Sequence, residues 1–222
     1  MGTGLLYLPK DAEKLRKLRF LYARRRLKNQ SFTCYGGIEV PRGIRNLTRL
    51  QDLQDVTASL ETLCDVAALT KLRLFSISGV TSEHSVKLCS AIMNMRDLGN
   101  LSITTSNENE ALPLEELHLP KTVYKLELIG KLEKIRMPQI LSSWPHLNNL
   151  SQLNLRFSKL DEDSFSSLMV LHGLCFQKVD KAYSGKELYF SALSFPKLQQ
   201  LDIWCSTTEP CQNRRWCTRK AC

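Results

Sequence analysis

Apolar residues recur along the chain in one short phrase, with leucine or a related residue at its first, fourth, seventh and ninth positions. Seven segments carry the phrase clearly and residues 123–128 carry a weaker copy. The seventh-position residues are Leu21, Leu53, Phe75, Leu101, Leu126, Leu153, Leu174 and Leu201. They are separated by 32, 22, 26, 25, 27, 21 and 27 residues. Such a period indicates a repeat protein, whose apolar residues become buried only when neighbouring copies stack.

The end of each phrase alternates apolar, polar and apolar residues, which is the period of a β-strand with one buried face. Stacked copies would form a parallel sheet on the concave side of an open, right-handed solenoid. The second copy is an exception, because Asp55 occupies the inward position after Leu53. A buried carboxylate is costly, so we expect this strand to be bulged or shifted.

The segments between strands predict helices and turns on the convex side. Residues 59–69 and 82–94 have helical periodicity, and Thr81 or Ser82 can cap the second helix. The residues expected to face inward are Leu60, Leu63, Val66, Ala67, Val86, Cys89, Ile92 and Met93. Cys64 is expected to be buried as well. The acidic residues 161–163 predict the first turn of a helix that leads to Phe165.

The net charge of +9 is concentrated at one end of the chain. Residues 1–50 hold twelve Lys and Arg against three Asp and Glu, whereas residues 51–205 hold fifteen against eighteen. Residues 24–26 could contact phosphate or an acidic partner, but a solvated face is favoured and no nucleic-acid partner is expected. The sequence contains no signal peptide and no apolar run of eighteen residues, which predicts a cytoplasmic protein without a membrane span.

The sequence offers no constellation of residues for catalysis. The four histidines fall in different repeats, and no P-loop, nucleophile elbow or metalloprotease motif occurs. Four cysteines at 205, 211, 217 and 222 lack the spacing of a zinc site. We therefore predict a protein that is not an enzyme and has no catalytic residues, cofactor or metal.

Two stretches carry most of a family resemblance, residues 8–22 and residues 40–53, and residues 59–73 and 193–201 match the same style. The second reads Pro-Arg-Gly-Ile-Arg-Asn-Leu-Thr-Arg-Leu-Gln-Asp-Leu from position 41. Together they resemble the leucine-rich-repeat region of coiled-coil, nucleotide-binding plant disease-resistance proteins of the grass type. The resemblance implies an α/β leucine-rich-repeat solenoid of about eight irregular repeats over residues 1–205. Residues 206–222 lack the pattern and are expected to be an unstructured, non-native tail.

The resemblance also implies a function in the plant defence response. Such a region recognises a pathogen effector or its host target and holds the nucleotide-binding module inactive. Because the chain has no P-loop, we expect a truncated form without the nucleotide-binding domain. The alternatives are a free-standing signalling scaffold and a non-functional gene fragment. The expected protein contacts on the concave face are Asn100, Ser102, Thr104, Lys125, Glu127, Gln152, Asn154, Arg156, Gln200, Asp202 and Trp204, with Ile129 and Gln177 also expected to face outward.

Overall fold

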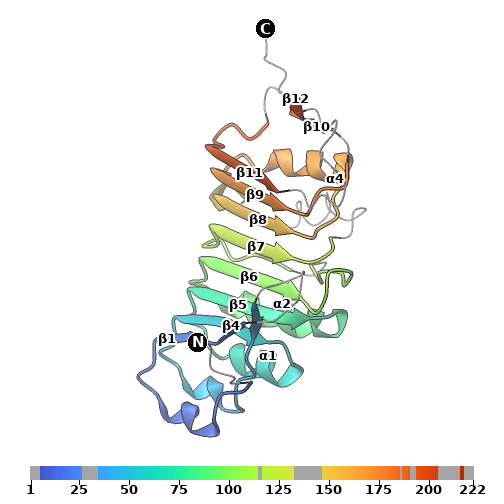
Figure 1. The fold of residues 1–222 in the computed structure, drawn as a ribbon. Helices are drawn as coiled ribbons and strands as arrows, with labels where there is room; N and C mark the ends of the chain where they lie inside the picture. The colour runs from blue at the N-terminus through green and yellow to red at the C-terminus, as the bar shows by residue number, and fades with distance from the viewer. Residues whose placement is uncertain are drawn as a thin grey trace.

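The computed structural model describes residues 6–26, 35–114, 117–132, 147–185, 187–190, 194–204 and 216–217. These residues form an α/β solenoid built on one eight-stranded parallel sheet (Figure 1). The eight strands of this sheet stack in chain order, and strands β2, β3 and β10, which lie between them in the sequence, belong to two separate small sheets. They are β1 (Phe20–Tyr22), β4 (Asp52–Thr57), β5 (Leu74–Val80), β6 (Asn100–Thr105), β7 (Lys125–Ile129), β8 (Gln152–Arg156), β9 (Phe176–Asp180) and β11 (Gln200–Trp204).

The core is a column of mostly apolar side chains that the strands point inward. The parallel register pairs Leu53 with Phe75, Phe75 with Leu101, and so on to Leu126 and Leu153. None of these five side chains is more than 1% exposed. Each repeat therefore depends on its neighbours to remove its leucines from water, as the sequence pattern predicts.

Helices cover one face of the sheet (Figure 1). They are α1 (Leu60–Val66), α2 (Ser85–Asn94) and α4 (Glu162–Ser167), with 3-10 helices η1 (Lys10–Lys14), η2 (Ile44–Asn46), η3 (Ser82–His84), η5 (Leu147–Asn149) and η6 (Leu168–Val170). Thr81 caps η3, as expected. Asp161 accepts a hydrogen bond from the Ser164 amide at 2.9 Å and caps α4, which confirms the acidic first turn.

The expected inward faces of the helices are partly wrong. In α2 the core-facing residues include Leu88 and Ile92, and Val86 and Met93 are 62% and 56% exposed. At about 100° per residue, Val86 and Met93 are turned far from the Leu88 side of the helix. In α1, Leu63 and Val66 are buried as expected, but Leu60 is exposed, Ala67 is half-buried and Cys64 is exposed.

The bulge expected in β4 is confirmed. The register shifts between Leu53 and Val56, and Asp55 has a φ of 54°, in the left-handed region. Val56 takes the inward position and is fully buried. The extra residue turns the Asp55 carboxylate out of the core and onto the opposite face of the sheet.

The long first repeat contains an inserted hairpin. Strands β2 (Arg24–Arg26) and β3 (Tyr35–Gly37) pair antiparallel between β1 and β4 in the sequence. The Gly37 amide donates to Ser78 Oγ at 2.8 Å. A Cβ at this glycine would lie 2.5 Å from the Val56 carbonyl carbon, so only glycine permits the approach. The hairpin accounts for the interval of 32 residues.

The prediction for the seventh strand is wrong. A strand on Leu174 was expected, but β9 begins at Phe176, and Gln177 and Val179 are its inward residues. The register pairs Gln177 with Leu153 on one side and with Leu201 on the other. The expected outward position of Gln177 is therefore also wrong, because its side chain is 0% exposed.

The predicted boundary at residue 205 lies outside the described residues. Of the tail, the structure describes Trp216–Cys217 (β12), which pairs in parallel with β10 (Leu188–Tyr189).

Candidate functional site

The outward side chains of the parallel strands form the concave face. In β6, Asn100 and Ser102 alternate with the buried residues Leu101 and Ile103. The parallel register sets Ser102 beside Glu127 of the next strand, so outward residues form rows that run across the strands. A partner would meet these rows rather than isolated side chains.

The structure places every candidate contact on one of four strands. They are Asn100, Ser102 and Thr104 on β6, Lys125 and Glu127 on β7, Gln152, Asn154 and Arg156 on β8, and Gln200, Asp202 and Trp204 on β11. Their access to solvent differs widely, from 9% exposed for Thr104 to 63% for Trp204. Ile129, which was also expected to face outward, is only 7% exposed.

A groove of about 370 Å³ crosses the middle of the concave face. The hydroxyl-bearing residues that line it are Ser76, Ser78, Ser102 and Thr104 of β5 and β6. Six of the candidate contacts line it: Asn100, Ser102, Thr104, Lys125, Glu127 and Arg156. Small hydroxyl side chains leave room for an inserted group, and the charged residues provide polar walls.

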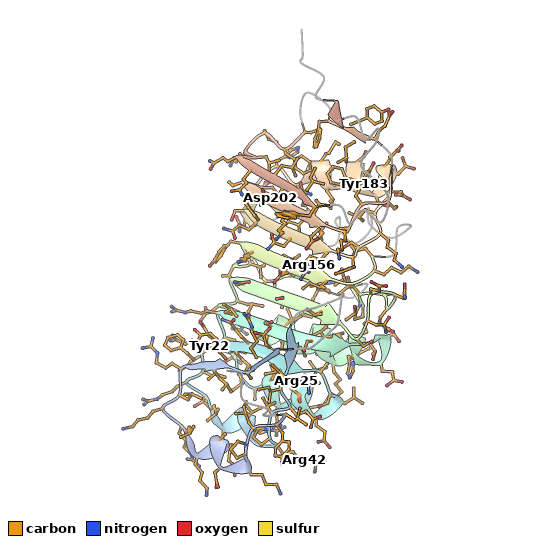
Figure 2. The ribbon with its side chains drawn as sticks, in the orientation of Figure 1. Tyr22, Arg25, Arg42, Arg156, Tyr183 and Asp202 are labelled. Atoms are coloured by element: carbon orange, nitrogen blue, oxygen red, sulfur yellow. The ribbon has the colours of Figure 1, made fainter. Side chains whose placement is uncertain are left out.

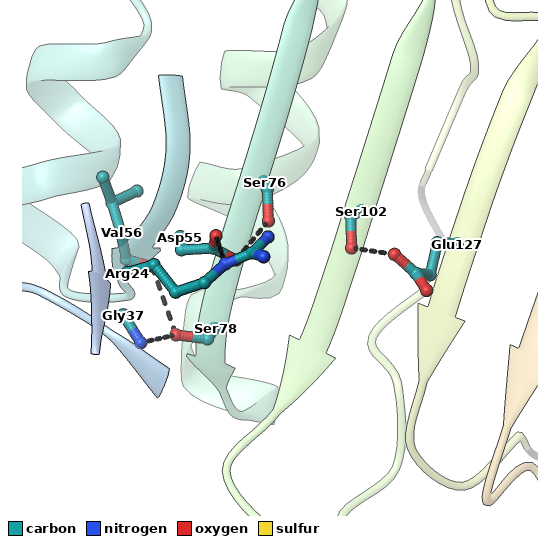
Figure 3. A network of polar contacts seen from close by, with 8 residues as sticks. All are labelled: Arg24, Gly37, Asp55, Val56, Ser76, Ser78, Ser102 and Glu127. Carbon is teal, nitrogen blue, oxygen red and sulfur yellow. Dashed lines mark hydrogen bonds and ion pairs between the residues drawn. The ribbon is translucent and has the colours of Figure 1, made fainter. Parts of the chain in front are cut away.

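The wall at the N-terminal side of the groove is a hydrogen-bonded network (Figure 3). Arg24 Nε donates to Asp55 Oδ2 at 2.7 Å, and Ser76 Oγ donates to Asp55 Oδ1 at 3.2 Å. On the other side, Ser102 Oγ donates to Glu127 Oε2 at 3.1 Å. The Asp55 side chain is only 19% exposed. These bonds fix the side chains before any partner arrives, which lowers the entropy cost of binding.

A second hollow lies beside the groove, toward the C-terminal strands. Its lining includes the candidate contacts Lys125, Gln152, Asn154, Gln200 and Asp202. Lys125 borders both hollows and thus joins them.

Arg156 and Trp204 are both held by neighbours. Arg156 lies near the middle of the sheet (Figure 2). Its Nε donates to Asp180 Oδ2 at 2.9 Å, so this guanidinium is half-buried in an ion pair. Lys178 Nζ lies 5.8 Å from the centroid of the Trp204 ring, within cation–π range. Trp204 presents a large, exposed apolar surface at the end of β11.

Sequence reasoning missed four residues of this face: Arg24, Asp55, Lys178 and Asp180. The last two were missed because the seventh strand was assigned three residues too early. The position of Gln177 midway between Leu153 and Leu201, 24 residues from each, could have revealed the correct frame. Arg24 lies in the inserted hairpin, where no repeat pattern exists to place it.

Two tyrosines have raised pKa values. Partial desolvation, followed by a hydrogen bond to Asp52, raises the pKa of Tyr22 on β1 (Figure 2). Away from the concave face, desolvation and then the charges of Glu162, Asp161 and Glu187 raise the pKa of Tyr183 to about 12. Neither group is placed to act as an acid or base near neutral pH.

The described part of the chain contains no cluster of three or more His, Cys, Asp and Glu side chains that could hold a metal ion. Within the same residues, no helix is long and apolar enough to cross a membrane.

Comparison with known proteins identifies the family. A family model described as a leucine-rich repeat region matches residues 1–215. The chain belongs to this family. Its members stack short parallel strands on a concave face, as β4 to β9 do here.

The repeats are of the plant disease-resistance type. Disease resistance protein RPM1 of Arabidopsis thaliana is 32% identical over 190 residues, which cover 84% of this chain and 20% of that protein. Probable disease resistance protein RF9 of the same plant is 27% identical over 203 residues, covering 90% and 18%. The chain thus spans about a fifth of the length of these curated relatives.

A solved leucine-rich repeat structure, an internalin from Listeria monocytogenes, aligns with 91% of this chain and 72% of its own. The sequence identity is 16% and the TM-score is 0.41.

Proposed function

We propose that this leucine-rich repeat region is a protein-binding module of the plant defence response that acts in the cytoplasm without catalysis. The observation that carries the proposal is the concave groove with the adjoining hollow. Its polar side chains stand in rows on a rigid parallel sheet, and several are already fixed by hydrogen bonds. Leucine-rich repeat regions are generally interaction modules that use this concave surface.

The partner we propose is a pathogen effector or its host target, together with the nucleotide-binding module of a related receptor. The relatives are named as disease resistance proteins, which supports a place in defence. Two side chains are the strongest anchors. Trp204 offers exposed aromatic surface, and Arg156 offers a planar guanidinium; these residue types are enriched where binding energy concentrates.

The test is a binding titration of the full chain against the nucleotide-binding module of a related receptor. Trp204→Ala removes one anchor, and Lys125→Glu reverses a charge on the concave face that forms no ion pair with another described residue. Each should weaken binding by about thirtyfold if it meets a central contact. Lys87→Glu on α2 is the matched control, because Lys87 is exposed away from the concave sheet.

A loss of affinity in Lys87→Glu as large as that in Lys125→Glu would contradict the proposal, since binding would then report net charge rather than the concave face. Binding that survives both concave substitutions unchanged would also contradict it. Circular dichroism of each variant checks that the fold is intact.

A further inference from the structure

A second surface, separate from the concave face, carries an unusual charge. It consists of three residues just before each strand in the first five repeats, namely the second, third and fifth positions of the repeat phrase. They are residues 16, 17 and 19; 48, 49 and 51; 70, 71 and 73; 96, 97 and 99; and 121, 122 and 124. We call it the basic flank. Its cations are Arg16, Lys17, Arg19, Arg49, Lys71, Arg73, Arg96 and Lys121, and all are exposed. Asp97 is the one acidic residue at these fifteen positions.

Backbone hydrogen bonds hold the basic flank in register. The Gln51 amide donates to the Arg19 carbonyl at 2.7 Å, the Arg73 amide to the Gln51 carbonyl at 2.7 Å, and the Gly99 amide to the Arg73 carbonyl at 2.8 Å. At about 4.8 Å between strands, five repeats extend the flank over about 20 Å. Figure 1 shows the starting ends of β4 to β8 in line along the left border of the sheet.

The charges of the basic flank are not neutralised by acidic neighbours. Among the ion pairs between described residues, none involves these eight cations. Arg19 bonds the neutral Gln51 side chain and lies over the Phe20 ring. Lys17, Arg49 and Lys71 occupy equivalent positions on successive repeats. Because adjacent strands lie about 4.8 Å apart and the Debye length at physiological salt is about 8 Å, like charges at such positions repel one another. An anionic partner would relieve that repulsion.

The charge is confined to one part of the solenoid. Among the nine equivalent positions of the last three repeats, Lys197 is the one Lys or Arg; the others are Asn148, Asn149, Ser151, His172, Gly173, Cys175, Pro196 and Gln199. A face that served only solubility would carry mixed charges along its whole length. The restriction to five repeats therefore marks a surface of defined extent.

Hollows and apolar side chains accompany the cations. One hollow of about 470 Å³ is lined by Arg16, Lys17 and Arg49. Another, of about 420 Å³, has Arg96 and Lys121 at its border and is otherwise mostly apolar. Its apolar lining is Met93, Leu119 and Pro120, and Met93 is 56% exposed. Cations beside exposed apolar groups are the chemistry of the interface between lipid headgroups and acyl chains.

We propose that the basic flank docks on an anionic lipid bilayer and orients the solenoid so that the N-terminal ends of its strands face the membrane. The cations line one border of the sheet, so they can meet a planar surface together. Single-stranded nucleic acid is disfavoured, because Tyr124 is the one aromatic residue at the fifteen positions, and a row of stacked bases would need several. The concave face stays free in this orientation, so the inference stands or falls independently of the concave binding site.

The test uses the full chain and vesicles of phosphatidylcholine with and without phosphatidylserine, in a flotation assay. The chain should bind only the vesicles that contain phosphatidylserine, and binding should fall as salt rises. The triple variant R49Q/K71Q/R73Q removes three exposed cations from the centre of the flank, none of which forms an ion pair with another described residue. Each cation near an anionic surface contributes about fivefold, so the triple variant should bind about a hundredfold more weakly.

The matched control is K87Q/K131Q/K159Q, which removes three exposed cations away from the border of the sheet where the strands begin, with the same change in net charge. It should bind nearly as the unchanged protein does. Equal losses in the two triple variants would overturn the proposal, and so would an absence of binding to phosphatidylserine vesicles. Tighter binding to DNA or to polyglutamate than to vesicles at equal salt would assign the flank to another partner and overturn it. Should the triple variant not fold, Arg73→Gln against Lys87→Gln repeats the comparison at about fivefold.

Discussion

Gln177 occupies a position that the repeat reserves for a leucine. It is paired in register with Leu153 and Leu201, and its side chain is 0% exposed. Neither its amide nitrogen nor its amide oxygen has a hydrogen-bond partner among the described residues. Burying an amide without partners costs about 1–3 kcal/mol in proteins. Gln177→Leu removes that cost with a side chain of similar size.

We therefore expect Gln177→Leu to raise the free energy of unfolding by about 1–3 kcal/mol. For a chain of this length the melting temperature should rise by about 2–4 °C for each kcal/mol. Urea denaturation followed by circular dichroism measures the change directly. The slope of the transition should stay the same, because the surface exposed on unfolding hardly changes.

Gln200→Leu is the matched control for this substitution. Gln200 lies on the adjacent strand β11, but its side chain is exposed, so the same chemical change should leave stability nearly unaffected. A Gln177→Leu variant that is less stable than the unchanged protein would refute the reasoning. It would mean that the amide is satisfied in the core, for example by a bound water.

Two further predictions concern packing and pH. Leu101→Ala should cost about 2–5 kcal/mol because Leu101 is fully buried in the middle of the column, whereas Asn100→Ala should cost little in the same urea assay; equal losses would contradict the strand register. The pKa of Tyr183 is about 12 in the folded protein against an ordinary 10.0, so the unfolded chain releases this proton first as pH rises. The contribution of Tyr183 to the free energy of unfolding should thus be fully present below pH 10 and be lost as the pH rises from 10 to 12. Tyr183→Phe should remove that part of the decline, and an unchanged profile in thermal melts at stepped pH would contradict the assignment.

The sequence predicted most of the sheet because stacking constrains its inward positions strongly. Leu53, Leu101 and Leu153 all occupy the buried column as expected. The β4 bulge was also predictable, since Asp55 could not remain in the core. In both cases a single strong cost, exposure of leucine or burial of a carboxylate, determined the outcome.

The prediction of the seventh strand failed because an incorrect frame fitted the repeat phrase better than the correct one. Leu168, Leu171 and Leu174 match the leucine positions of the phrase, whereas the correct frame places the polar Gln177 in the core. Helix faces were less certain, because a short amphipathic helix can be rotated by a turn that precedes it. Cys64 illustrates this, since its expected burial depended on the orientation of α1. The members of the concave groove could be predicted where they lie on regular strands, but Arg24 could not.

The β2–β3 hairpin changes how the solenoid comes apart. In a simple stack each repeat touches only its neighbours, so terminal repeats can fray one at a time. Here the hairpin follows β1 directly, bonds Asp55 on β4 through Arg24, and bonds Ser78 on β5 through Gly37. The first three strands of the sheet are thereby joined into one cooperative unit. Opening the N-terminal end requires all three to release together, whereas nothing comparable ties the described strands β7, β8 and β9 beyond their nearest neighbours.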